Sequence, residues 1–295
     1  MSEIRALPVA RARSSAARRR LIHRAIVYAG VAIYGLFAIF PLYWLFKSSF
    51  TVGLDLIGAT PLWLPRSLDL SNYERVLSVG LITTFFTNSV KIALISTVCS
   101  IAIASLAAYS LTRFRFRGRD LVQRSVLLAY MYPGILLAVP LTLFYVQIGL
   151  INTHLGLVIA YSTFSLPFAL WLLIAYFETI PHEIDEAARV DGATHLQVFT
   201  RIILPLAAPG IATASIFAFL GAWNEFTLGL VLIQQNELKT VPVGLALFLQ
   251  GGPGDTIEWG ARMAAGVMVI VPSLLFFLVS SGRISRGLAA GAVKG

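Results

Sequence analysis

The polar residues of this chain are few, and one group of them lies inside a long apolar stretch. The group is Trp223, Asn224, Glu225 and Phe226. A carboxylate at the centre of a bilayer costs about 2.5–3.5 kcal/mol on insertion scales, so Glu225 is expected to face a cavity or a partner. Two interpretations stay open. Either Asn224 and Glu225 line a polar route for a solute on which Trp223 or Phe226 stacks, or Glu225 pairs with a backbone donor or a basic group near the outer end of its helix.

The second polar group is the segment 181–205, whose residues predict two short helices joined by a sharp corner. Pro181 suits the first turn of a helix, and Gly192 suits the left-handed position that commonly ends one. Thr194 and Gln197 have the spacing of a capping box for the second helix. The apolar side of that helix is predicted to hold Leu196, Phe199, Ile202 and Ile203. We call this segment the elbow, and we expect it to be a rigid, charged connection between two apolar segments.

The elements that carry these residues are predicted to be membrane helices. Of the 295 residues, 57% are apolar and only 13% are charged, against about 25% charged residues in soluble domains. The mean hydropathy is +0.80. Six apolar segments are long enough, at about 1.5 Å per residue, to cross a hydrocarbon core of roughly 30 Å; they are 25–46, 87–112, 122–146, 155–177, 206–233 and 260–281. The predicted fold class is all-α, a polytopic membrane protein with six transmembrane helices.

Lysine and arginine residues are unevenly distributed between the predicted loops, and this asymmetry predicts the topology. Seventeen would lie on one side of the membrane: Arg5, Arg11, Arg13, Arg18, Arg19, Arg20, Arg24, Arg113, Arg115, Arg117, Arg119, Arg124, Arg189, Arg201, Arg283, Arg286 and Lys294. Four would lie on the other side: Lys47, Arg66, Arg75 and Lys239. The larger number places both termini and the elbow in the cytoplasm. The arginines from 113 to 119 are interpreted as a topology anchor.

This topology divides the chain into three parts. Residues 1–24 are predicted to be a disordered, basic cytoplasmic tail, residues 25–282 a six-span domain that contains the elbow, and residues 283–295 a flexible cytoplasmic tail. The apolar segment after residue 24 is too long for a signal peptide and lacks an A-x-A site, so a cleaved leader is rejected.

Catalytic and metal chemistry find no support in the residue pattern. None of the four lysines, at 47, 91, 239 and 294, follows a glycine, so the phosphate-binding P-loop is absent and the chain is not expected to hydrolyse ATP. The single Cys99 forms no disulfide within the chain, and no carboxylate, histidine or cysteine cluster predicts a metal site. No basic stripe with interleaved aromatic residues indicates nucleic acid.

Two further patterns concern the packing of the helices. Small residues recur every four positions at Gly210, Ala214, Ala218 and Ala222, and again at Ser96, Ser100, Ala104 and Ala108. Such stripes let helix backbones approach closely in lipid, so they predict a tight bundle or a subunit interface, although chance in an alanine-rich chain could also produce them. Kinks are expected in helices three, four and six from Pro133, Pro140, Pro167 and Pro272.

The elbow resembles the EAA loop of the membrane subunits of ABC importers. The shared pattern is Glu186-Ala187-Ala188, three residues, Gly192, nine residues, Ile202, one residue, and Leu204-Pro205. In that family the loop forms a coupling helix that docks into a cleft on a separate cytoplasmic ATPase. The resemblance therefore implies an ATPase-coupling role for Glu186, Ala187, Ala188, Asp191 and Gly192. The alternative is an ordinary amphipathic loop between two spans.

Other segments resemble carbohydrate importer permeases, so the likeness covers nearly the whole chain from about residue 25. The quartet 223–226 is similar to their fifth helix, and the segment 287–295 is similar to the tail of the smaller permease of maltose-type importers. That tail reaches between the ATPase subunits, which implies an interface role for Gly291 and Lys294. The resemblance implies a type I ABC importer permease fold.

The function implied by this resemblance is that of a permease subunit, not an enzyme, in the bacterial inner membrane. It would form half of the pathway for a di- or oligosaccharide such as maltose, maltodextrin or trehalose. The implied partners are a second permease subunit, two ATPase subunits that bind ATP and Mg²⁺, and a periplasmic or lipid-anchored sugar-binding protein. The open alternatives are a permease for glycerol phosphate or another sugar, an ion-coupled secondary transporter and, less supported, a membrane-embedded enzyme.

Overall fold

The computed structural model describes residues 9–52, 55–56, 60, 62–78, 80–248 and 259–292, and every regular element within these ranges is helical. The all-α prediction is thus confirmed. The α-helices are α1 Val9–Ser49, α2 Ser71–Leu77, α3 Ile82–Arg113, α4 Arg119–Tyr130, α5 Gly134–Gln147, α6 His154–Phe177, α7 His182–Val190, α8 His195–Val198, α9 Leu204–Leu206, α10 Ala208–Trp223, α11 Thr227–Leu232, α12 Val241–Phe248 and α13 Trp259–Ala292. A π-helical turn, η2, spans Phe199–Ile203, and a 3₁₀ turn, η3, spans Asn236–Leu238.

The predicted membrane spans correspond to four unbroken helices and two bent pairs. The unbroken spans lie at Leu21–Ser49, Ile82–Arg113, His154–Phe177 and Trp259–Leu278. The helices α4 and α5 meet at 97°, and the run His195–Leu206 meets α10 at 77°. Counting each bent pair as one span gives six, the predicted number.

The bend between α4 and α5 falls at a predicted proline. Pro133 directly precedes α5 in an extended conformation and cannot continue a helix from α4. By contrast, Pro140, Pro167 and Pro272 lie inside α5, α6 and α13, which run past them without a break. Proline therefore ends a helix at the first of these four positions, and the kinks expected at the other three stay a prediction.

Three segments differ in local structure from the prediction. The fifth span was expected to reach residue 233, but α10 ends at Trp223 and α11 is a separate short helix. Residues 9–24 are helical instead of disordered, because alanine and arginine both favour helix. The same holds for the C-terminal tail, where α13 continues to Ala292 and only residues 293–295 lie outside the described chain.

Helices α3, α6 and α10 form the centre of the bundle, and the small-residue stripes lie where they meet. All eight stripe residues are buried. The hydroxyl of Ser100 donates to the Ser162 carbonyl at 3.2 Å, and a Cβ at Gly210 would lie 2.5 Å from the ring of Tyr176. The helices thus approach closely, as the stripes predict.

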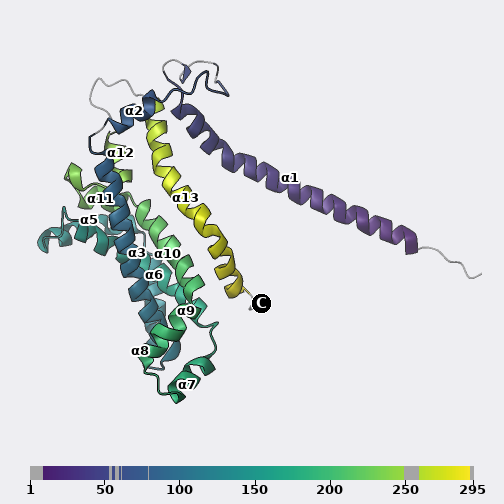
Figure 1. Cartoon of the computed structure of the whole chain (residues 1–295), viewed down its shortest axis with the longest axis vertical. Coiled ribbons are helices and arrows are strands. Elements are labelled where there is room, and N and C mark those ends of the chain that lie inside the picture. Colours follow the sequence, from purple (N-terminus) through teal and green to yellow (C-terminus); the bar gives the residue numbers. More distant parts are fainter. Residues whose placement is uncertain are drawn as a thin grey trace, which may run out of the picture.

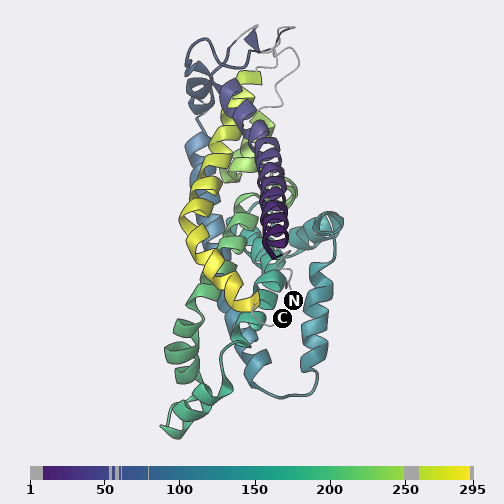
Figure 2. The same ribbon diagram turned by 90° about the vertical axis from the view of Figure 1, so that its right-hand side faces the viewer.

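The long axis of the bundle separates two ends of different character (Figures 1 and 2). The elbow helices α7 and α8 lie at one end, and α2 and α12 lie at the other. Helix α1 leaves the bundle at the second end and projects away from it (Figure 1). None of the residues in the most apolar window of its span Leu21–Ser49 is buried, so this surface is left for lipid or another chain.

Candidate functional site

The corner of the elbow is built by a glycine in the left-handed region, as predicted. Gly192 has φ +87°. Its N–H donates to the Arg189 carbonyl at 3.0 Å, and the N–H of Ala193 donates to the Ala188 carbonyl at 3.0 Å. This pair of bonds is the Schellman motif, which satisfies carbonyl groups that the end of α7 leaves open. The corner is therefore fixed by the backbone itself.

The second helix of the elbow begins with the predicted capping box. Thr194 Oγ1 accepts from the Gln197 N–H at 3.3 Å, and Gln197 Oε1 accepts from the Thr194 N–H at 2.8 Å. Phe199 and Ile203 are buried in the bundle core. Leu196 is predicted on the same apolar side, but it is 66% exposed.

A buried ion pair attaches the elbow to the bundle. Arg113 Nε, at the end of α3, lies 2.6 Å from Asp185 Oδ2 in α7, and both side chains are almost fully buried. Arg113 also donates to the Ile180 carbonyl at 3.0 Å. Burial raises the pKa of the Asp185 carboxyl, and the Arg113 guanidinium opposes this shift. Removing either partner would leave an uncompensated charge in the interior.

The interpretation of the arginine run as a topology anchor does not include this role of Arg113. The signal lay in Asp185, which shares the inward face of α7 with the apolar residues Ile184 and Ala188. A carboxylate on a buried helix face requires a partner. The helix spacing identifies that need, but only the tertiary fold identifies Arg113 as the residue that meets it.

Aromatic contacts reinforce the attachment at the same end of α3. The rings of Tyr109 and Phe199 lie 5.0 Å apart, and those of Phe114 and His195 also lie 5.0 Å apart. The Tyr109 hydroxyl points to the His195 carbonyl at 3.4 Å. The elbow and α3 are therefore held together at several points and are expected to move as one body.

The five predicted coupling residues do not share one face of the elbow. Ala188 is half-buried and packs against the bundle core. The other four, Glu186, Ala187, Asp191 and Gly192, are exposed. Val190, which was not predicted, is 88% exposed. We call Glu186, Ala187, Val190 and Asp191 the outer face of α7.

The intramembrane carboxylate is used as a helix cap. Glu225 Oε1 accepts from the Leu228 N–H at 2.9 Å, and Oε2 accepts from the Gly229 N–H at 3.0 Å. These are free donors at the start of α11, where a negative charge is favoured. The interpretation in which Glu225 pairs with backbone donors is thus confirmed, and it explains why the helix restarts after Trp223.

The other members of the quartet lie in different surroundings. Trp223 is 2% exposed, stacks against Phe219 and donates from Nε1 to the Val269 carbonyl at 3.3 Å. Asn224 donates to the Leu220 carbonyl at 2.8 Å within its own helix. Phe226 is partly exposed. None of these three lines the cavity that Glu225 faces, so the quartet is not a single contact surface.

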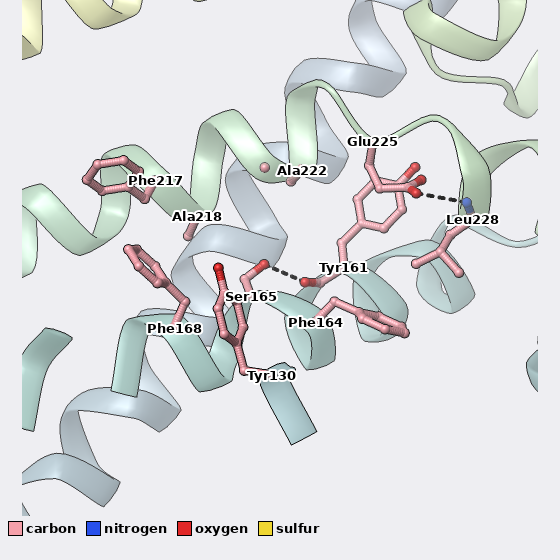
Figure 3. Close-up of a pocket in the computed structure, with 11 residues that line it drawn as sticks. Tyr130, Tyr161, Phe164, Ser165, Phe168, Phe217, Ala218, Ala222, Glu225 and Leu228 are labelled. Carbon is pink, nitrogen blue, oxygen red and sulfur yellow. Dashed lines mark hydrogen bonds between the residues drawn. The ribbon is translucent and has the colours of Figure 1, made fainter. Parts of the chain in front are cut away.

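That cavity has a volume of about 380 Å³ and lies between α4, α6, α10 and α11 (Figure 3). Its lining residues are Tyr130, Tyr161, Phe164, Ser165, Phe168, Phe217, Ala218, Gly221, Ala222, Glu225 and Leu228. The sequence predicts only Glu225 among these as a site residue, because the remaining ten are distributed over four helices whose packing the sequence does not give.

Two remaining expectations concern the tail and metal ions. Gly291 belongs to α13, and Lys294 lies outside the described residues. Among the described ranges, no group of three or more histidine, cysteine, aspartate or glutamate side chains is arranged to hold a metal ion.

The chain matches known proteins over most of its length. Residues 100–289 match the family described as "binding-protein-dependent transport system inner membrane component". The trehalose/maltose transport system permease protein MalG of Thermococcus litoralis is 38% identical over 94% of this chain and 99% of its own length. The sulfoquinovosyl glycerol transport system permease protein SmoH of Agrobacterium fabrum is 34% identical over 87% of this chain and 89% of its own.

A solved structure supports the fold independently. A chain from a bacterial ABC transporter that imports the acidic polysaccharide alginate superposes with a TM-score of 0.76 at 24% identity, covering 90% of this chain and 97% of that one. The family match therefore excludes the alternative in which the chain is an ion-coupled transporter that works alone. The chain belongs to the inner membrane components of binding-protein-dependent transport systems, and it is a permease subunit of an ABC sugar importer without an ATPase of its own.

Proposed function

We propose that this permease transmits the closure of a cytoplasmic ATPase to the membrane helices through the outer face of α7. The observation that carries the proposal is the two-sided construction of the elbow. Its inner side is locked to α3 by the Arg113–Asp185 pair. Its outer side presents Glu186, Val190 and Asp191 without burying them. Force applied to the outer face would therefore reach α3 directly.

The chemistry of the outer face suits a protein partner. Val190 is a large apolar side chain that is 88% exposed, and the carboxylates of Glu186 and Asp191 flank it. An apolar anchor surrounded by charges is the usual anatomy of an interface centre and its rim. We infer that two ATPase subunits, which carry the ATP and Mg²⁺, supply the matching cleft, with Gly291 and Lys294 of the tail close to their interface.

Helix α1 supports a second permease subunit as partner. Its span Leu21–Ser49 is apolar and projects from the bundle (Figure 1), and no residue of its most apolar window is buried. A helix of this kind can pack on a neighbouring membrane subunit. We propose a heterodimer of permeases, with both termini and the elbow in the cytoplasm and a sugar-binding protein on the other side.

The proposed cargo is a maltose-, maltodextrin- or trehalose-like sugar. The 38% identity to the trehalose/maltose permease supports this choice. The relative whose name specifies sulfoquinovosyl glycerol is 34% identical, so identity alone separates the two cargoes only weakly. Glycerol phosphate and other sugars are the alternative cargoes.

The test replaces the outer face within the complete importer. Glu186→Lys combined with Val190→Asp should reduce co-purification of the ATPase and ATP-driven sugar uptake at least about tenfold, since an apolar anchor and a charged contact are both lost. Thr200→Lys is the matched control, because Thr200 is exposed on the elbow but outside the outer face. Full ATPase association in the double variant, or uptake without any ATPase, would overturn the coupling role.

A further inference from the structure

We propose that the cavity beside Glu225 is a binding subsite for one uncharged pyranose ring of the transported sugar. This inference rests on the proposed function, and it assigns the substrate contact to a specific set of side chains on this subunit. It also predicts a preference that the comparisons leave open, namely neutral over anionic saccharides.

The size and position of the cavity suit a saccharide in transit. Its volume of about 380 Å³ falls within the range of roughly 300–1,000 Å³ that is typical of small-molecule sites. Ser165, which lines it, lies near the middle of α6, so the cavity is at the depth of the bilayer interior. The exposed positions of Tyr130 and Phe217 at its edge leave it accessible from outside the bundle.

The walls provide aromatic faces for the apolar side of a sugar ring. Phe168 contacts Phe217 at 5.3 Å and Tyr130 at 5.9 Å between ring centroids, so three rings form a continuous wall. Phe164 adds a fourth ring on α6 (Figure 3). A mainly aromatic lining with a few polar groups is the usual composition of a site that binds a small organic molecule.

The polar groups converge at the other end of the cavity. The Tyr161 hydroxyl lies beside the Glu225 carboxylate and the Thr240 hydroxyl, and it forms no hydrogen bond of ordinary geometry with either. Tyr161 is 2% exposed. A Cβ at Gly229 would lie 3.0 Å from the Tyr161 oxygen and 3.4 Å from the Thr240 oxygen, so the absence of a side chain there makes room for this arrangement.

Unused hydrogen-bonding capacity remains at this end. A carboxylate has about four acceptor sites, and the cap of α11 occupies two of those on Glu225. The buried hydroxyl of Tyr161 makes no hydrogen bond of ordinary geometry, although buried polar groups are normally paired. Adjacent hydroxyl groups of a sugar can donate to the carboxylate and accept from Tyr161 at the same time.

The charge of the cavity selects between classes of sugar. Glu225 is the only charged residue among those that line it, and no lysine or arginine is present there to compensate. A sulfonate, phosphate or uronate group would be repelled by this carboxylate in a medium of low dielectric constant. An uncharged pyranose meets no such barrier.

The decisive variant fills the cavity without disturbing the fold. A Cβ at Gly221 meets no atom within 4 Å, although Gly221 lines the cavity. Gly221→Leu should therefore occupy the space of the sugar, whereas Gly221→Ala makes the same backbone change with little added volume. Tyr161→Phe removes only the hydroxyl, and Tyr145→Phe is its control, since Tyr145 is buried outside the cavity.

The complete importer, with its binding protein, is reconstituted in vesicles and supplied with ATP. Uptake is measured for maltose and trehalose as neutral probes, and for sulfoquinovosyl glycerol and glycerol 3-phosphate as anionic ones. We expect uptake of at least one neutral sugar and neither anion. Gly221→Leu should lower that uptake at least about tenfold, Gly221→Ala less than about twofold, and Tyr161→Phe should raise the KM roughly tenfold while Tyr145→Phe does not.

Three results would overturn the subsite: uptake of neither neutral sugar, uptake of an anion at the neutral rate, or near-normal uptake by Gly221→Leu. ATP hydrolysis is measured in the same vesicles, because it distinguishes failure of the proposed subsite from failure of the proposed coupling to the ATPase. Hydrolysis that still responds to the binding protein leaves the coupling role in place and rejects the subsite alone. Loss of the ATPase from the wild-type complex would reject both.

Discussion

The elbow and the segment 223–226 are both polar interruptions between apolar helices, yet they use their carboxylates in opposite ways. In the elbow, Glu186 and Asp191 are exposed on the outer face of α7. In the second segment, Glu225 faces inward and caps α11. The elbow carboxylates are accessible to a partner protein, whereas the Glu225 carboxylate lies beside a cavity within the bundle.

The carboxylates of Asp185 and Glu225 are stabilised by different partners. Asp185 is held by a guanidinium at 2.6 Å, whereas Glu225 is held only by backbone N–H groups. The guanidinium compensates the charge of Asp185, whereas the residues that line the cavity include no cation for Glu225. The elbow carboxylate is therefore suited to fixing a joint, and the cavity carboxylate to meeting a ligand.

The largest effect is expected from breaking the joint. Arg113→Ala leaves Asp185 charged, buried and unpaired, which should cost about 3–5 kcal/mol in free energy of unfolding. Denaturant unfolding of the purified protein, followed by circular dichroism, measures this. Arg115→Ala is the control, because Arg115 is exposed in the same run and should change stability by less than about 0.5 kcal/mol.

A double variant sharpens the interpretation of that result. Arg113→Met with Asp185→Leu removes both charges and keeps the volume, so most of the lost stability should return. If Arg113→Ala were as stable as the wild type, the ion pair would not be the attachment between α3 and the elbow.

The next effect concerns the corner. Gly192→Val forces a β-branched residue to φ +87°, at a cost of about 1–2 kcal/mol. We expect ATP hydrolysis to continue while sugar uptake per ATP falls. Gly192→Asn is the matched control, since asparagine tolerates this region. Normal coupling in the valine variant would show that the corner is not needed as a rigid element.

A smaller effect is expected at the capping box. Thr194→Ala removes the side chain that accepts from Gln197 N–H and should cost about 1 kcal/mol. Thr194→Ser keeps the oxygen and should behave as the wild type. The midpoint of thermal unfolding compares the two variants, and equal midpoints would remove the box from the set of stabilising contacts.

These local devices could be predicted from the sequence, because they depend on neighbours in the chain. The left-handed Gly192 and the bonds between Thr194 and Gln197 follow from residue type and spacing alone. The Arg113–Asp185 pair and the cavity could not be predicted, since each joins helices far apart in the chain. The break after Trp223 was missed because the apolar pattern continues to residue 233, and the cap that allows it depends on where the Glu225 side chain points.

The smallest loss of stability is expected for a variant of Trp223. This variant tests whether the residue serves in helix packing or in ligand contact. Trp223→Phe loses the 3.3 Å bond to the Val269 carbonyl and should cost about 0.5 kcal/mol. The KM for sugar uptake should stay unchanged, in contrast to Tyr161→Phe. An increase in KM as large as that of Tyr161→Phe would return Trp223 to the substrate route.

The central claim is that the outer face of α7 contacts an ATPase in the cytoplasm, and a single cysteine tests it most directly. The variant carries Cys99→Ala and Val190→Cys, and in the assembled importer it is labelled with a reagent that reacts with the thiol at one end and is photoactivated at the other. Glu74→Cys on α2, at the opposite end of the bundle, is the control. We predict that the residue 190 cysteine cross-links to the ATPase and is shielded from an impermeant maleimide added outside the cell, while the residue 74 cysteine is labelled from outside and forms no cross-link. Labelling at residue 190 from outside, or no cross-link to the ATPase, would contradict the coupling role.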